Sequence, residues 1–249
     1  FIVDPIQGGA GTSLNMNANE VIANRAIEIL GGEKGDYSII NPNDDVNCGQ
    51  STNDVIPTAG KMTSLRLLKN LKKELLRLHK ALCAKAKEFD HVIKMGRTQM
   101  QDAVPIRLGQ EFNAYSVAVM RDIHRMDRAM EEMCTLNMGG TAVGTGINAD
   151  EAYLRRIVPN LVEVSDMEFV QAYDLIDATQ NLDPFVAVSG AVKACAVTLS
   201  KIANDLRLLS SGPRAGFGEI NLPAKQNGSS IMPGKVNPVI PEVVNQVAF

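Results

Sequence analysis

The sequence has few of the residues from which metal centres and disulfide frameworks are built. Its four cysteines lie far apart and form no C-x-x-C pair: Cys48, Cys83, Cys134 and Cys195. Its three histidines share no metal-ligand spacing: His79, His91 and His124. This pattern disfavours a zinc site, disulfides, and serine–histidine or cysteine–histidine catalysis. We therefore expect no metal and a reducing, cytoplasmic location.

An excess of charge of either sign is also missing. The 25 basic and 28 acidic residues leave a net charge of −3, so we expect no basic surface that attracts nucleic acid or an anionic membrane. No run of 18 apolar residues is free of charge, so we expect no helix that spans a bilayer. Phe1–Pro5 contains neither an initiator methionine nor the basic segment of a signal peptide. Both chain ends are expected to be internal to a longer protein.

A nucleotide-binding glycine loop is absent as well. Gln7–Leu14 contains three glycines but lacks the G-K-[ST] of a Walker loop, and Leu14 stands where the dinucleotide fingerprint needs a glycine. The segment is predicted to be a flexible turn that presents Thr12 and Ser13. A polar helix is predicted to follow over about 17–30, where two glycines end it.

What the sequence does contain is helical periodicity. Leucine and methionine recur at steps of three and four over Lys61–Glu88, a stretch without glycine or proline. A second apolar pattern of this kind begins at Pro105 and continues to Met133. Shorter helices are expected within 150–180. A third long helix is predicted over Pro184–Leu209, and the methionines are expected to fill a bundle core.

The third long helix is expected to be buried on every side. Between Val186 and Leu199 it carries a single charge, Lys193, and its other side chains are apolar or small. Because one chain with three long helices cannot easily surround such a helix, we expect partner subunits to cover it.

Four loops separate the predicted helices: 41–54, 96–102, 137–148 and 228–238. The asparagines and aspartates of the first could be ordinary turn residues, but the segment contains almost nothing that packs. The last holds two serines, a lysine and an asparagine between glycines and prolines that prevent regular structure. Such a segment is either a plain surface loop or a lid that closes over a ligand.

The length of the first long helix restricts how a site can be assembled. Its 28 residues span roughly 40 Å, with Ser51–Asn53 just before the helix and Thr98–Gln99 just after it. Both polar clusters can contact one small ligand only if an antiparallel neighbour brings its opposite end alongside. Otherwise one of the clusters is a structural turn.

Three motifs in this order resemble the signature regions of the aspartase/fumarase superfamily. They are Gln50–Asp54 (QSTND), Gly96–Gln99 (GRTQ) and Gly228–Pro238 (GSSIMPGKVNP). The resemblance implies an all-α fold, a long antiparallel helix bundle that assembles as the multi-helix core of a homotetramer. It also implies that residues 1–249 are the central helical catalytic domain. The N-terminal domain and most or all of the C-terminal domain would then be absent from this chain.

Within the superfamily, three stretches resemble the aspartate ammonia-lyase branch: Val3–Ser13, Gln99–Pro105 and Val239–Gln246. The resemblance implies a carbon–nitrogen lyase that reversibly eliminates ammonia from L-aspartate to give fumarate, without a cofactor, in sites shared between subunits. Fumarate hydratase of the same superfamily is an alternative reading. An inactive or structural fragment of a superfamily member is another, although Ser229 and Lys235, whose loss would favour it, are both present.

The resemblance also implies roles for individual residues. Ser229 is the general base that removes a proton from Cβ, and Lys235, six residues along the loop, is the cation that favours its alkoxide. Contacts to the β-carboxylate are implied for Thr12, Ser51, Thr52 and Ser230. Contacts to the α-carboxylate are implied for Thr98, Lys235 and Asn237, and Asn53 is expected near the amino group.

Two positions depart from the pattern of many relatives. Gln99 stands where many relatives carry histidine and cannot relay protons at neutral pH, so it is expected to orient the substrate. The general acid is therefore left open. Asn41 also replaces a common histidine, which leaves an accessory anion site there in doubt.

Overall fold

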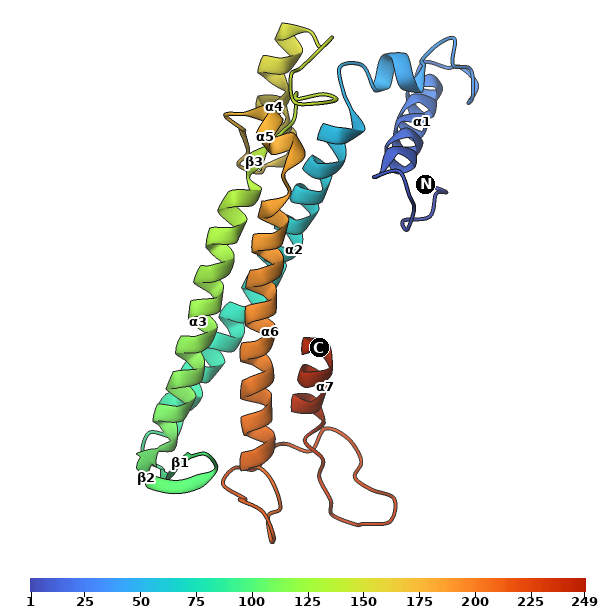
Figure 1. Ribbon diagram of the computed structural model, residues 1–249. Coiled ribbons are helices and arrows are strands. Elements are labelled where there is room, and N and C mark those ends of the chain that lie inside the picture. Colours follow the sequence, from blue (N-terminus) through green and yellow to red (C-terminus); the bar gives the residue numbers. More distant parts are fainter. The chain divides into compact units, whose positions relative to one another are not determined.

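Helices dominate the computed structural model, which describes residues 1–249 (Figure 1). They are α1 Thr12–Ile29, the single π-helical turn η1 Pro42–Val46, α2 Thr52–Glu88, α3 Leu108–Met133, α4 Glu151–Ser165, α5 Leu175–Gln180, α6 Asp183–Leu209 and α7 Val239–Ala248. The strands are β1 Ile93–Thr98, β2 Gln101–Arg107, β3 Thr135–Leu136 and β4 Val170–Gln171. The predicted all-α class is confirmed, with one hairpin and one two-residue strand pair added.

The chain forms two compact units. The first comprises Phe1–Leu67 and Met130–Val186, and the second comprises Leu68–Ala129 and Ala187–Phe249. Helices α2, α3 and α6 each contribute residues to both units. The assignment of residues 1–249 to one catalytic domain stays a prediction.

The core of the second unit lies between its segments of α2, α3 and α6 (Figure 1). The buried side chains recur at steps of three and four along these helices: Leu75, Leu82, Leu108, Phe112, Tyr115, Val119, Ile123, Met126, Ala129, Ala191, Cys195 and Ile202. Full burial of one large apolar side chain stabilises a fold by about 1.5–3 kcal/mol. The apolar pattern is therefore a core face, as predicted, and Met126 fills part of it.

Helix α2 begins nine residues earlier than Lys61, where the sequence placed the start of its uninterrupted stretch. Ser51 directly precedes it, and Thr52 and Asn53 form its first turn, so the expectation that Ser51–Asn53 precede the helix is wrong for two residues. Pro57 lies inside the helix and has no N–H for the carbonyl of Asn53. The Nδ2 of Asn137 donates to that carbonyl instead, at 3.0 Å. This replacement partner allows the helix to extend through Pro57.

The predicted loop 96–102 is instead part of an antiparallel hairpin of β1 and β2. Gln99 and Met100 form its two-residue turn, with φ of 51° and 61°, as a type I′ turn requires. Pro105 pairs with Met95 inside β2, so the expectation that Pro105 starts the next helix is wrong. That helix, α3, begins at Leu108.

Helix α1 begins at Thr12, so the predicted flexible turn around Thr12 and Ser13 and the later helix start are wrong. Gly11, with a φ of 89°, caps the helix in a left-handed conformation. Few apolar side chains are buried along α1. Instead, the buried Asn15 and Asn19 each donate to Asn47 Oδ1, at 3.3 and 3.0 Å. Polar contacts therefore attach α1 to the segment that follows η1.

The glycine-rich stretch 137–148 is an irregular turn, as predicted, but its first part is buried. Asn137, Met138 and Thr141 are each less than a tenth exposed. A Cβ on Gly144 would lie 2.4 Å from the Cα of Ile176 in α5, so glycine is needed for this close approach. The shorter helices expected within 150–180 are α4 and α5.

Helix α6 confirms the third predicted long helix. Ala191 and Cys195 are buried in the bundle, whereas Val197 is 63% exposed. This chain alone therefore leaves part of the helix uncovered, as expected, and its burial by partner subunits stays a prediction. By length and composition α6 is also apolar enough to cross a membrane. The absence of a charge-free run of 18 apolar residues did not predict this. A single helix of this kind is weak support for a membrane span, because core helices meet the same criterion.

Candidate active site

The loop Gly228–Pro238 connects the segment after α6 to helix α7. It makes few hydrogen bonds. Lys235 N–H donates to Met232 O at 3.3 Å, and Ile231 N–H donates to Ser229 Oγ at 3.3 Å. Ser229 is half-buried, while Ser230 and Lys235 are exposed. The predicted irregular loop is therefore confirmed, and it presents its polar side chains to solvent.

Gly228 and Lys235 bring two points of this loop into contact. A Cβ on Gly228 would lie 1.9 Å from the carbonyl oxygen of Lys235, so no residue with a side chain fits. Ser229 follows Gly228 directly, and its backbone therefore lies beside that of Lys235. No hydrogen bond joins the two side chains in this structure. The backbone of the loop thus approaches itself next to Ser229 and at Lys235.

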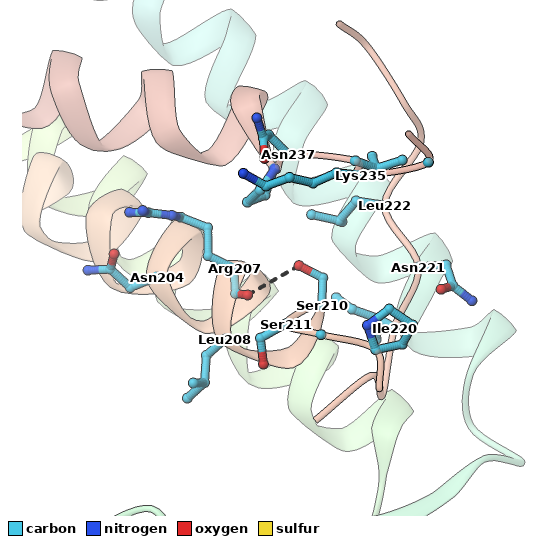
Figure 2. A pocket seen from close by; sticks show the side chains of 15 residues that line it. Asn204, Arg207, Leu208, Ser210, Ser211, Ile220, Asn221, Leu222, Lys235 and Asn237 are labelled. Atoms are coloured by element: carbon cyan, nitrogen blue, oxygen red, sulfur yellow. Dashed lines mark hydrogen bonds between the residues drawn. The ribbon is translucent and has the colours of Figure 1, made fainter. Parts of the chain in front are cut away.

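A cavity of about 680 Å³ adjoins the loop (Figure 2). Lys235 and Asn237 of the loop line it, together with Asn204 and Arg207 of α6 and Asn221. Figure 2 shows Lys235 and Asn237 on the same side of the cavity. The two loop residues assigned by resemblance to one carboxylate therefore face one space.

The start of α2 is built around a buried carboxylate. Asp54 has no exposed surface. Its Oδ1 accepts from Ser51 N–H at 3.0 Å, and its Oδ2 accepts from Gly139 N–H and Thr141 N–H at 3.3 and 3.0 Å. Burial raises the pKa of Asp54, and these backbone hydrogen bonds oppose the shift. Asp54 therefore fastens the QSTND segment to the glycine-rich turn.

The neighbours of Asp54 are held by the same turn and by α1. Asn53 Nδ2 donates to Ala142 O at 2.7 Å, and Asn53 N–H donates to Ser51 Oγ at 3.1 Å. Thr52 Oγ1 accepts from Asn15 Nδ2 at 3.1 Å. Ser51, Thr52 and Asn53 are thus fixed in position before any ligand binds.

Thr12 occupies the first position of α1. Its hydroxyl donates to Gly9 O at 2.8 Å, and the side chain is exposed. The hydroxyl oxygen keeps a free lone pair, because donation uses only the proton. The structure places Thr12 at a helix N-terminus, where backbone N–H groups favour anions.

The hairpin that carries Thr98 and Gln99 is anchored by an ion-pair network. Lys94 Nζ lies 2.7 Å from Glu111 and 3.0 Å from Glu219, and Arg97 also pairs with Glu219. Burial alone would raise the pKa of Glu219, but hydrogen bonds from Arg97 and Lys94 outweigh it and lower the pKa. Thr98 and Gln99 themselves are exposed at the hairpin tip.

The predicted site residues fall into two groups, one in each unit. Thr12, Ser51, Thr52 and Asn53 lie in the first unit. Thr98, Gln99, Ser229, Ser230, Lys235 and Asn237 lie in the second. Each group is therefore a partial site within its own unit.

Sequence reasoning missed three residues that support these groups. Asp54 lies within the QSTND motif, and its position there is a signal for a role. Asn137 opens the glycine-rich stretch, whose composition indicates only a turn. Arg207 lies in the last turn of α6, and no motif surrounds it. Their contacts become visible only when distant segments meet.

Long helices bundled around an apolar core, with a glycine-flanked serine–lysine loop, define a lyase of the aspartase/fumarase type. A family model described as a lyase matches residues 1–249. The chain belongs to this lyase family.

The relatives are ammonia-lyases by name. The chain is 59% identical to the aspartate ammonia-lyase of Bacillus subtilis and 53% identical to that of Escherichia coli. Each alignment covers 100% of this chain and 52% of the relative. The chain thus spans about half the length of the curated relatives it matches.

Solved structures agree on the fold. A cobalt-bound fumarate lyase:delta crystallin from Brucella melitensis has a TM-score of 0.97 at 56% identity, over 100% of this chain and 54% of that chain. A class II fumarase from Schistosoma mansoni has a TM-score of 0.86 at 38% identity, over 96% of this chain and 53% of that chain. The identity to ammonia-lyases is thus higher than that to this fumarase.

Proposed function

We propose that the protein containing this chain is an aspartate ammonia-lyase, which reversibly converts L-aspartate to fumarate and ammonia. The observation that carries the proposal is the loop Gly228–Pro238, in which Gly228 meets the backbone of Lys235 and in which Lys235 and Asn237 line one cavity. Identities of 53–59% to ammonia-lyases over the whole chain support the substrate. The residues 1–249 would supply the central helical catalytic part.

The proposed reaction begins with proton removal from Cβ of aspartate by the Ser229 oxygen. A serine hydroxyl is a poor base at neutral pH, so its alkoxide must be favoured by a nearby cation, for which Lys235 is placed. The electron pair left on Cβ moves into the adjacent carboxylate and forms an aci-carboxylate dianion. When this pair returns to form the C=C bond, the C–N bond breaks and the amino group leaves as ammonia.

The dianion needs donors that are in place before the charge develops. Ser51 and Thr52 meet this condition, because Asp54 and Asn15 hold them. Thr12 and Ser230 would complete the set around the β-carboxylate. Ser51, Thr52 and Ser230 offer hydroxyl donors, and the Thr12 hydroxyl would turn its proton from Gly9 O to the carboxylate.

The rest of the substrate would be held by amides and cations. Thr98, Lys235 and Asn237 would bind the α-carboxylate, and Asn53 would lie near the amino group. Gln99 would orient the substrate. Because an α-ammonium group already carries its protons, it can leave as neutral ammonia without a separate general acid.

The complete site is proposed to form between subunits of a cytoplasmic homotetramer. Helix α2 has 37 residues and is about 55 Å long at 1.5 Å per residue. This is longer than the roughly 40 Å predicted from the sequence, so the argument for a site shared between subunits still applies. The exposed apolar side chains of α6, among them Val192 and Val197, supply a surface for partner chains.

A substrate panel tests the activity. The full-length protein is incubated with L-aspartate, L-malate and argininosuccinate, and fumarate is followed by its ultraviolet absorbance. Fumarate is expected from L-aspartate alone. Formation from malate but not aspartate would replace the proposal by fumarate hydratase. Activity of the full-length protein but not of residues 1–249 would restrict the chain by itself to an inactive fragment.

Subunit complementation tests the shared site. Ser51→Ala and Ser229→Ala chains are each expected to be inactive, and mixed tetramers are expected to regain part of the activity. Rescue arises because some sites then receive both intact residues from different chains. Verified mixed tetramers without any rescue would contradict a site built from several subunits.

A further inference from the structure

The cavity beside the serine–lysine loop is positively charged. Lys235 and Arg207 are the two charged residues that line it, and no aspartate or glutamate is among the lining residues. Neither cation forms an ion pair within residues 1–249. Amides from Asn204, Asn221 and Asn237 complete the polar part of the lining. Two cations with no carboxylate of their own, together with amide donors, suit an anionic ligand.

Arg207 is held in place at the edge of this cavity. It lies in the last turn of α6 and is half-buried. Asn245 of α7 is buried, and its side-chain amide lies beside the guanidinium. In one orientation of this amide, Nδ2 donates to Asn204 Oδ1 at 2.6 Å. In the other, the amide oxygen lies 2.8 Å from Arg207 Nη1 and can accept a hydrogen bond, because a guanidinium only donates. Such a bond uses one of the five N–H groups and leaves others for a ligand.

Figure 2 shows how Arg207 is arranged relative to the loop. Its side chain extends from α6, below Lys235 and Asn237 of the loop in this view. Helix α7 begins directly after the loop and contains Asn245. The amide that lies beside the Arg207 guanidinium therefore belongs to the helix that follows the loop. A planar guanidinium fixed in this way can bind a carboxylate through two parallel hydrogen bonds, which an ammonium cannot do.

A simpler role for Arg207 is compensation of the helix dipole. A cation in the last turn of a helix is stabilising by itself. That role predicts neither the cavity nor the second cation that faces it from the loop. It also predicts that replacement of Arg207 would alter stability and leave ligand affinity unchanged, which makes the two roles separable.

We propose that Arg207 is a further carboxylate-binding residue of this site. It would act with Lys235 and Asn237 on one carboxylate of a small dicarboxylate. Only the assignment of that carboxylate as the α-carboxylate of aspartate rests on the proposed function. The proposal that the cavity binds a dicarboxylate is independent of that function.

The test uses the full-length protein and succinate, a dicarboxylate that has no amino group to eliminate. Succinate binding is measured by calorimetry for the wild type and for Arg207→Gln, Arg207→Lys and Arg214→Gln. Hydrogen bonds to a charged partner correspond to roughly a 10- to 100-fold change in affinity. We expect Arg207→Gln to weaken succinate binding by about that factor and Arg207→Lys to restore only part of it, because lysine lacks the planar fork.

Arg214→Gln is the matched control. Arg214 is exposed, lies seven residues from Arg207 and does not line the cavity. The Arg214→Gln variant loses the same charge as Arg207→Gln, at a position that does not contact the proposed ligand. The affinity of this variant for succinate should therefore equal that of the wild type. Thermal unfolding of each variant shows whether Arg207→Gln remains folded. If Arg207→Gln does not fold, Arg207→Lys carries the comparison.

The outcomes separate this proposal from the proposed function. If Arg207→Gln or Arg207→Lys folds and binds succinate as tightly as the wild type, Arg207 is not a binding residue. If the wild type binds succinate through Arg207 but forms no fumarate from aspartate, the cavity is confirmed and the ammonia-lyase function fails. If the wild type is active, KM for aspartate should rise by a similar factor in Arg207→Gln while kcat changes little. A loss confined to kcat would also overturn the assignment.

Discussion

The start of α2 and the loop Gly228–Pro238 carry the same kinds of side chain but are held in opposite ways. Around Ser51–Asp54, hydrogen bonds arrive from α1 and from the glycine-rich turn, and Asp54 is fully buried. Within the loop, side chains are mostly exposed and the hydrogen bonds are local, with Ile231 N–H and Lys235 N–H each donating at 3.3 Å. The first region is therefore fixed in advance of an anion, whereas no distant partner holds the polar side chains of the loop.

This difference suggests that the two regions have different roles in the reaction. Donors that stabilise developing charge act best when they are fixed beforehand. A base and cation on a movable loop can exclude water on closure and still release the product. Four variants test these roles, beginning with the largest expected effect.

Removal of the loop hydroxyl is expected to have the largest effect on the reaction. Ser229→Ala should lower kcat for aspartate by roughly 10²–10⁴-fold, because a general base contributes about that factor. The thermal midpoint should stay unchanged, since Ser229 makes a single hydrogen bond, at 3.3 Å, to the backbone. Steady-state kinetics and thermal unfolding measure the two effects. A variant with near-normal kcat would remove Ser229 from the mechanism.

A methyl group on Gly228 tests whether the close approach within the loop matters. Gly228→Ala must separate the backbone from the Lys235 carbonyl, 1.9 Å from the added Cβ. Because a displacement of about 1 Å can cost roughly 100-fold in rate, kcat should fall by about that factor.

Gly234→Ala is the matched control for this variant. Gly234 lies in the same loop at a φ of 83°, but no atom lies within 4 Å of an added Cβ. Gly234→Ala therefore introduces backbone strain of about 1–2 kcal/mol without a clash. Equal losses of kcat in the two variants would show that loop strain, and not the Gly228–Lys235 contact, limits the reaction.

In the prepared region, the expected effect is on stability first. Asp54→Asn keeps the shape of the side chain but turns an NH₂ group toward backbone N–H donors. The free energy of unfolding should fall by about 1–3 kcal/mol, as expected when buried hydrogen bonds are lost. Urea denaturation measures this change. An unchanged midpoint would show that the three hydrogen bonds of Asp54 do not hold the start of α2.

The smallest expected effect concerns the anchor of the hairpin. Glu219→Gln should lower stability at neutral pH by about 1 kcal/mol, through the loss of its ion pairs. Arg97 and Lys94 lower the pKa of Glu219 below its ordinary value of 4.5. The ionised Glu219 therefore contributes to folding stability at pH values above 4.5. This contribution disappears as the pH falls through the lowered pKa. The stabilities of wild type and variant, measured by denaturation, should therefore converge in acid, and a difference that persists there would exclude this ion-pair origin.

Much of the fold could be predicted from the sequence. Apolar side chains at steps of three and four place the long helices, because that spacing forms one face of an α-helix. Pro184–Leu209 differs from α6 by one residue at its start. The hairpin could not be found in this way, because its strands contain Gly96 and Pro105 and its turn depends on two left-handed residues, Gln99 and Met100.

The errors at helix starts arise because both helices begin in polar segments. Helix α1 begins after the left-handed Gly11, and helix α2 begins in a segment whose Asn53 carbonyl is satisfied by a distant partner. Asn137 accommodates Pro57 by binding the carbonyl of Asn53, although 84 residues separate Asn137 and Asn53. Local propensity contains no information on such a partner.

For the candidate site, the sequence by itself determined the residue types and their order in three motifs, because chemistry constrains which side chains can bind carboxylates and remove a proton. Only the tertiary structure decided how they are held. It placed Lys235 and Asn237 at one cavity with Arg207, and it fixed Ser51 through Asp54. These relations depend on contacts between segments far apart in the chain, and such contacts exist only once the apolar faces have packed.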